Sequence, residues 1–281
     1  MPVSDTSVPL VSICCHAYNH EKYIRECLNG FVKQKTSFPF EILIHDDASS
    51  DGTAEIIREY ELKFPQLFRC VFQTENQFLK QNTLLNILFP MSKGRYIALC
   101  EGDDFWTDEN KLQKQVDVLE KNSHYSMSFH SVEVSNQIPE VNYSYPIPSK
   151  DVLKFRDIVF KHYIPTCSLI FRFSFLPNPL PSWLFKSKIG DIPLELMLAD
   201  KGDAYFFKEN MGCYRRNSSS LTSSQEQIKN GRRIFISVYS NLNRHFNYKY
   251  FYLFSFLLVK LRLGYVKDWL KGLSSSNLME R

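Results

Sequence analysis

Residues 93–119 read KGRYIALCEGDDFWTDENKLQKQVDVL, and this stretch decides the fold. The apolar run Arg95–Cys100 predicts a strand, which ends at an acidic cluster over residues 101–104. Apolar residues then recur at helical spacing over residues 108–119, so a helix is expected to follow. A strand that ends in acids before a helix is typical of an α/β sheet with a site at the strand end.

The same alternation precedes this stretch. Residues 8–16, 41–44 and 68–72 are short strand-like runs, and helical spacing fills residues 23–32 and 53–64 between them. Strands separated by helices of this length indicate a mostly parallel α/β sheet flanked by helices. Ligands of such sheets bind at the carboxyl ends of the strands.

The pattern changes after about residue 123. A helix is expected over residues 191–201, and from residue 225 onward the chain is helical, with aromatic and basic residues mixed. We therefore expect a core over residues 1–222 and a helical C-terminal extension over residues 223–281. Short strands between Pro-rich loops are expected at residues 126–134, 167–172 and 204–214.

The overall composition gives information on nucleic acid binding, cellular compartment and membrane insertion. A net charge of +4 is too small to indicate nucleic acid binding by itself. The 7 cysteines are scattered without zinc-site spacing, which favours a reduced, cytoplasmic compartment. The N-terminus lacks a signal-peptide pattern, and the longest apolar run, residues 250–259, would cover about 15 Å of a bilayer core of about 30 Å.

The acidic cluster predicts a metal site. Glu101, Asp103 and Asp104 repel one another unless a cation offsets their charge. Oxygen ligands at a strand end suit Mn²⁺ or Mg²⁺, which also bind phosphate oxygens. The alternative is a solvated acidic turn.

A second acidic pair follows the strand at residues 41–44. A carboxylate of Asp46 or Asp47 could accept the N3–H of uracil or thymine, and the alternative is an Asx turn or a cap for the helix at Thr53. Because both acidic clusters end strands of one parallel sheet, we expect them at one edge.

Three segments in this order resemble the family 2 inverting glycosyltransferases, whose nucleotide-sugar-binding core has the Rossmann-like GT-A fold. They are VSICCHAYNHEKYIRECLNGFVKQ (residues 11–34), FEILIHDDASSDGTAEII (residues 40–57) and KGRYIALCEGDDFWTDENKLQKQVDVLE (residues 93–120). The resemblance is close over residues 10 to about 125 and weaker to about 222, so residues 1–222 are expected to form the catalytic domain.

The resemblance implies a metal site of DxD type formed by Glu101, Asp103 and Asp104, with Mn²⁺ or Mg²⁺ offsetting the charge of the departing diphosphate. The residues that would contact the nucleotide sugar are Ala17, Tyr18, Asp46, Asp47, Asp103, Arg215 and Arg216. Two positions depart from the family pattern, since His16-Ala17 replaces Pro-Thr and Asn217 replaces His. His16 itself either touches the donor or is simply hydrogen-bonded.

Inverting transfer is a single in-line displacement, so a base must take the proton of the acceptor hydroxyl. The family places an acid at the start of a helix in the second half of the chain, and Asp191 in KIGDIPLE (residues 188–195) matches this element. The alternative for Asp191 is an ordinary helix N-cap, with Glu195 as the substitute base. Trp106 could stack on a sugar or pack in the core, and Trp183 is a weaker candidate for acceptor contact.

The sequence thus predicts a metal-dependent inverting glycosyltransferase of the hexosyltransferase class. It would use a UDP- or dTDP-sugar and a saccharide or lipid-linked acceptor, in surface polysaccharide synthesis. The alternatives are an inactive GT-A-fold binding protein and a sugar-phosphate nucleotidyltransferase, although the latter should carry a Gly-rich basic loop after the first strand. The basic and aromatic residues over 244–271 either contact the inner face of the cell membrane or pack on the core or on a second subunit.

Overall fold

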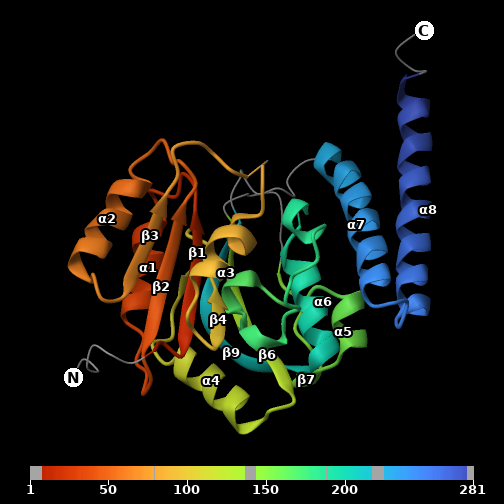
Figure 1. Cartoon of the computed structure of the whole chain (residues 1–281). Helices are drawn as coiled ribbons and strands as arrows, with labels where there is room; N and C mark the ends of the chain where they lie inside the picture. The colour runs from red at the N-terminus through yellow and green to blue at the C-terminus, as the bar shows by residue number, and fades with distance from the viewer. Residues whose placement is uncertain (1–7, 79, 137–143, 188, 217–224, 277–281) are drawn as a thin grey trace.

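The computed structural model describes residues 8–78, 80–136, 144–187, 189–216 and 225–276 (Figure 1). One sheet of 9 strands runs through the molecule in the order β3-β2-β1-β4-β8-β6-β9-β5, with β7 paired to β9. Its first part is parallel and consists of β1 (Val11–Ala17), β2 (Phe40–Asp46), β3 (Phe68–Phe72) and β4 (Tyr96–Leu99). The predicted α/β fold is confirmed.

Helices cover both faces of this parallel part. On one face α1 (Ile24–Val32), α2 (Thr53–Lys63) and α4 (Lys111–Lys121) pack around residues that include Ile42 and Ile44. Leu43, between these two isoleucines, belongs to the core on the other face of the sheet. Successive side chains of one strand point to opposite faces, so an unbroken apolar run indicates a strand that is buried on both sides.

The second half of the chain adds strands of both directions. β6 (Tyr125–Asn136) pairs with antiparallel β8 (Ile170–Arg172) and with parallel β9 (Asp203–Arg216). The short strands β5 (Phe105–Trp106) and β7 (Val152–Leu153) are both antiparallel to β9. The pairing of β5 with β9 therefore places the residues that directly follow the acidic cluster next to the last strand along the chain.

The connections contain short helical elements. α6 (Asp191–Lys201) has the predicted bounds, and its Pro193 lies in the first turn, where no backbone N–H is needed for the helix. The other elements are the π-helix Leu84–Leu88, α3 (Phe89–Met91), α5 (Phe155–Phe160) and the 3₁₀ turns Thr166–Ser168, Phe173–Phe175 and Leu184–Lys186.

The chain continues into two helices, α7 (Gln225–His245) and α8 (Phe251–Ser276), which lie side by side next to α5 and α6 (Figure 1). The Phe155 ring stacks on Tyr250 at 3.6 Å between centroids. Among the helices of the described ranges, none is both long and apolar enough to cross a membrane. Side chains of both helices and of the turn between them are buried in the core that contains α6, namely Val238, Tyr239, Leu242, Phe246 and Phe254.

Candidate active site

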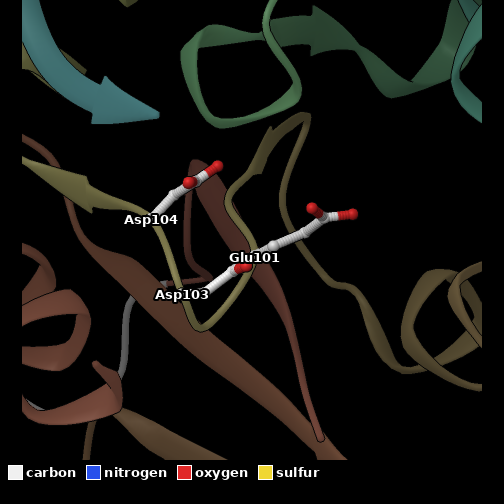
Figure 2. Close-up of side chains that lie close together, drawn as sticks. All are labelled: Glu101, Asp103 and Asp104. Atoms are coloured by element: carbon white, nitrogen blue, oxygen red, sulfur yellow. The ribbon is translucent and has the colours of Figure 1, made fainter. Parts of the chain in front are cut away.

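The three acidic residues after β4 converge, as predicted. One carboxylate oxygen each of Glu101, Asp103 and Asp104 lies within 4.8 Å of the others (Figure 2). The Gly102 N–H donates to the carbonyl of His16 at 2.7 Å, which fixes the loop against the end of β1. The parallel strands thus bring residues 16 and 102 together at one sheet edge.

Asp104 is the buried member of the cluster. Its side chain is 1% exposed, and its Oδ1 accepts the Arg215 N–H at 2.7 Å. Oδ2 has no hydrogen-bond partner among the described residues. Burial, and then the charges of Asp103 and Glu101, raise the pKa of Asp104 well above its usual value. An orphaned carboxylate oxygen beside two further carboxylates is a donor set that fits a divalent cation.

Glu101 keeps contact with solvent, but the surrounding protein removes part of its hydration. This desolvation, followed by the charges of Asp103 and Asp191, raises the pKa of Glu101 to about 8. The influence of Asp191 shows that the start of α6 lies close to the acidic cluster. The predicted base therefore lies within electrostatic range of one predicted metal ligand.

His20 was missed by the sequence analysis. Its Nε2 lies 4.0 Å from a carboxylate oxygen of Asp103, and its Nδ1 has no hydrogen-bond partner among the described residues. Burial lowers the pKa of His20 although Asp103, Asp51 and Asp46 oppose this shift. The only signal in the sequence is its position directly after Asn19 at the end of the first strand.

The residues predicted to bind the nucleoside meet at the ends of β1 and β2. The Asp47 N–H donates to the Ala17 carbonyl at 2.9 Å, and the Asp47 Oδ1 accepts the Gln77 N–H at 2.7 Å. Tyr18 is 46% exposed and is open to a ligand. The Asp46 carboxylate accepts the N–H and the hydroxyl of Ser49, three residues on, so it holds the local turn in place, a structural role like the alternative considered for it.

His16 is hydrogen-bonded within the protein. Its Nδ1 lies 3.2 Å from the Thr83 hydroxyl, and its ring makes an edge contact with His45. Burial, and then His45, lower the pKa of His16 to about 3, so the ring is neutral at physiological pH. Of the two roles considered for His16, donor contact and hydrogen bonding within the protein, this arrangement matches the second.

Arg215 supports the acidic loop from β9. Its guanidinium donates to the Asp103 carbonyl at 2.8 Å, pairs with Glu26 and lies over the Phe105 ring at 4.3 Å. Arg216 ends β9 beside it and is half-buried. Asn217 lies outside the described residues.

Trp106 lies in the core. Its side chain is 4% exposed, the ring packs on Phe31, and its Nε1 donates to the Cys167 carbonyl at 2.7 Å. No face of the ring is open to a sugar, so core packing describes Trp106. The sequence signal that could have shown this is Gly30 within a helix, because a Cβ there would lie 2.9 Å from the Trp106 carbonyl. Trp183 is half-buried against the larger core.

Asp191 is the first residue of α6 and is half-buried. Its Oδ1 accepts the N–H of Ile192 at 2.9 Å, which satisfies one free donor of the first helical turn. Glu195, one turn later, is 2% exposed. The first two turns of the helix therefore present one accessible and one buried acid.

The comparison with known proteins fits this arrangement. The sequence model described as "Glycosyl transferase family 2" matches residues 12–176, more than half of the chain. The chain belongs to glycosyl transferase family 2. Its acidic cluster and the ends of β1 and β2 lie within the matched part of this family 2 glycosyltransferase.

Other proteins are similar in sequence to this family 2 chain. An uncharacterized protein of Mycobacterium tuberculosis is 35% identical over 215 residues, which are 76% of this chain and 61% of the relative. The match thus covers about three fifths of the length of that relative. TuaG of Bacillus subtilis, named as a teichuronic acid biosynthesis glycosyltransferase, is 32% identical over 133 residues, 47% of this chain and 50% of the relative.

Solved structures share the fold of this family 2 chain. TarS of S. aureus in complex with UDP-GlcNAc superimposes with a TM-score of 0.61 at 18% identity over 82% of this chain and 66% of TarS. A Pyrobaculum calidifontis mannosyltransferase in complex with GDP-Man and Mn²⁺ gives a TM-score of 0.54 at 15% identity over 85% of this chain and 66% of that chain. At this identity the likeness identifies the fold alone.

Proposed function

We propose that this chain is a metal-dependent inverting glycosyltransferase that acts in surface polysaccharide synthesis. The observation that carries the proposal is the orphaned Oδ2 of Asp104 beside Glu101 and Asp103, with Asp191 of α6 within electrostatic range of Glu101. The donor would be a UDP- or dTDP-sugar, and the acceptor a saccharide or a lipid-linked saccharide. The names of TuaG and of the TarS complexes with UDP and UDP-GlcNAc support this choice.

On the donor side, Tyr18 and Asp47 would contact the nucleoside, with the backbone of Ala17 beside them. Asp46 would act through the turn that it holds with Ser49. Asp103, Asp104 and Glu101 would hold Mn²⁺ or Mg²⁺, which supplies charge stabilisation to the departing diphosphate when bound. Arg216 would contribute a further positive charge there, while Arg215 holds the loop.

On the acceptor side, Asp191 would accept the proton of the attacking hydroxyl. A general base must lie within hydrogen-bond reach of that proton, and Asp191 is the accessible acid of α6 beside Glu101. Its carboxylate is held at the helix terminus by the N–H of Ile192, which fixes its orientation.

Thermal unfolding tests the donor and metal assignment. UDP and dTDP should raise the melting temperature only with Mn²⁺ or Mg²⁺, because a ligand that binds the folded state stabilises it by mass action. Asp103→Ala should abolish the shift, whereas Asp117→Ala, on the following helix, should retain it. If no nucleotide diphosphate produces a shift at millimolar concentration, the inactive binding protein becomes the better description.

We also propose that the chain works at an anionic membrane surface. Tyr252, Phe256, Val259 and Leu263 are between 56% and 86% exposed and recur at i, i+4, i+7 and i+11 on α8, so they form one stripe. Lys260 and Arg262 are exposed beside this stripe. An apolar stripe flanked by cations suits a helix that lies on anionic lipid. The side chains of Lys267, Trp269 and Lys271 lie outside the described residues.

Vesicle sedimentation tests the membrane surface. The protein should pellet with phosphatidylglycerol vesicles and not with phosphatidylcholine vesicles. Phe256→Glu should lower the bound fraction, and Leu62→Glu, at an exposed leucine on α2, should not. Equal binding of both variants would contradict the assignment of this face.

A further inference from the structure

A cavity of about 70 Å³ lies between α5, α6 and the two C-terminal helices, which stand side by side in Figure 1. None of the residues assigned to the donor or the metal lines it. The lining residues are Ile158, Val159, Phe160, Lys161, His162, Ile192, Glu195, Leu196, Tyr239 and Leu257.

The polar wall of the cavity is centred on Glu195. This side chain is 2% exposed, and its Oε1 has no hydrogen-bond partner among the described residues. Burial, and then the charge of Asp191, raise the pKa of Glu195 well above its usual value, which favours the neutral carboxyl, a group that can both donate and accept a hydrogen bond. An unsatisfied buried carboxyl that lines a cavity is a site for a hydroxyl-bearing ligand.

The polar wall also adjoins the proposed base. Asp191 and Glu195 are separated by four residues on α6, so they lie on the same face of the helix. Burial, and then the charges of Glu195 and Asp191, raise the pKa of Tyr239 to about 12. Asp191 also opposes the burial effect that lowers the pKa of His162. Three cavity residues are therefore close enough to Asp191 to interact with its charge.

The apolar wall continues to the outer surface. Phe160 lines the cavity and is 48% exposed, and its ring contacts Phe256 at 5.9 Å between centroids. Phe256 belongs to the exposed stripe on α8, and its neighbour Leu257 lines the cavity. A continuous apolar path thus connects the inside of the cavity with the outer face of α8.

We propose that this cavity is the acceptor subsite for an amphiphile, with a hydroxyl of the head group at Glu195 and the hydrocarbon chain against Phe160 and Leu257. This inference rests on the proposed function and narrows its acceptor to a lipid-linked saccharide. A water molecule occupies about 30 Å³ of liquid volume, so the cavity takes only the junction of head and chain. The rest of the chain would lie along the stripe of α8.

The test measures dissociation constants of methyl, hexyl and octyl β-D-glucoside by calorimetry on the full chain, each below its micelle concentration. Octyl glucoside should bind at least about tenfold more tightly than methyl glucoside, since two buried methylene groups suffice for such a gain. Leu257→Trp, which fills the cavity, and Phe160→Ala, at a half-exposed residue, should each reduce this gain to less than about threefold. Leu62→Trp on α2 should retain it.

The same samples are tested with UDP and Mn²⁺, so that failure of the inference and failure of the proposed function are distinguishable. A normal nucleotide response with no chain-length gain, or with a gain that survives in both cavity variants, would overturn the acceptor subsite. Loss of the nucleotide response in the unmodified chain would overturn the proposed function and, with it, the identification of the ligand as an acceptor.

Discussion

The side-chain amine of Lys111 lies in the interior of the protein. It is fully buried, its Nζ lies 4.1 Å from the centroid of the Trp106 ring, and it has no hydrogen-bond partner among the described residues. Burial lowers the pKa of Lys111 to about 7, although Cys100, Cys167 and Asp108 oppose the shift. A buried amine avoids the desolvation of its charge by giving up its proton.

Lys111 should make the stability of the protein depend on pH. An unfolded lysine has a pKa of about 10.4, so between pH 7 and about 10 the unfolded chain binds more protons at this site than the folded chain. The free energy of unfolding should therefore rise with pH by up to about 1.4 kcal/mol per unit. Urea unfolding at pH 7, 8 and 9 should show this rise in Lys121→Met, an exposed site on the same helix, and not in Lys111→Met. The same slope in both variants would contradict the role of Lys111.

The proposed base can be separated from donor binding. Asp191→Asn should lower nucleotide release from the donor sugar by at least about 100-fold, because the variant cannot accept the hydroxyl proton. The stabilisation by UDP and Mn²⁺ should stay unchanged. Glu55→Gln, at an exposed first-turn acid of α2, is the control and should keep full activity. If Asp191→Asn retains activity, another group must take the proton.

At the scale of elements, the site depends on the close approach of β1, α1 and the loop after β4. A Cβ at residue 102 would lie 2.9 Å from the His20 Nδ1 and 3.1 Å from the His16 carbonyl. A Cβ at residue 52 would meet only the mobile end of Glu21, at 2.7 Å from its Oε1. Of these two glycines, Gly102 is therefore the one that a fixed backbone group confines.

Gly102→Ala should displace the acidic loop. We expect a loss of about 1–3 kcal/mol in the free energy of unfolding, as for overpacked sites, together with a weaker Mn²⁺-dependent response to UDP. Gly52→Ala should change stability by less than about 1 kcal/mol because Glu21 can move away. Both values come from urea unfolding with and without Mn²⁺. Equal losses of unfolding free energy in the two variants would contradict the claim that close contacts at residue 102 position the acidic loop.

The sequence predicted those elements whose pattern is long enough to show a period. β3 and α6 have the expected bounds, and β1, β2 and α2 differ from them by a few residues. The two-residue strands β5 and β7 carry no period, because their position is set by pairing with β9. The same limit applies within the site. The cluster at residues 101–104 follows from strand order, whereas the core position of Trp106 follows from packing against a distant helix.

At the scale of the whole molecule, the C-terminal helices share a core with the preceding part of the chain. Val238 and Leu242 of α7, Phe246 directly after it and Phe254 of α8 are buried in one cluster with α6. Lys249 and Tyr250, between the two helices, both donate to the Asp200 carboxylate of α6. The division of the chain at residue 222 stays a prediction, and this packing indicates that the two parts stabilise each other.

Truncation tests this coupling. Four side chains of α7 and α8, together with Phe246 between the helices, are buried in the core, and their burial contributes roughly 10 kcal/mol in total. This is comparable to the whole free energy of unfolding of a typical domain. A chain of residues 1–222 should therefore lack a cooperative melting transition, whereas residues 1–264 should keep it. A cooperative transition in the shorter chain would identify residues 1–222 as an independent domain.

The hydrogen bond from the Arg215 N–H to Asp104 also fixes an order of events during synthesis of the protein. The three acids of the proposed metal cluster leave the ribosome before residue 215 does, because the N–H that donates to Asp104 is 111 residues further along the chain. Until β9 is added, the acids stay hydrated and repel one another. Metal capture by the proposed site would therefore come at the end of folding, and a nascent chain stalled before residue 215 should hold Mn²⁺ no better than a loose acidic peptide.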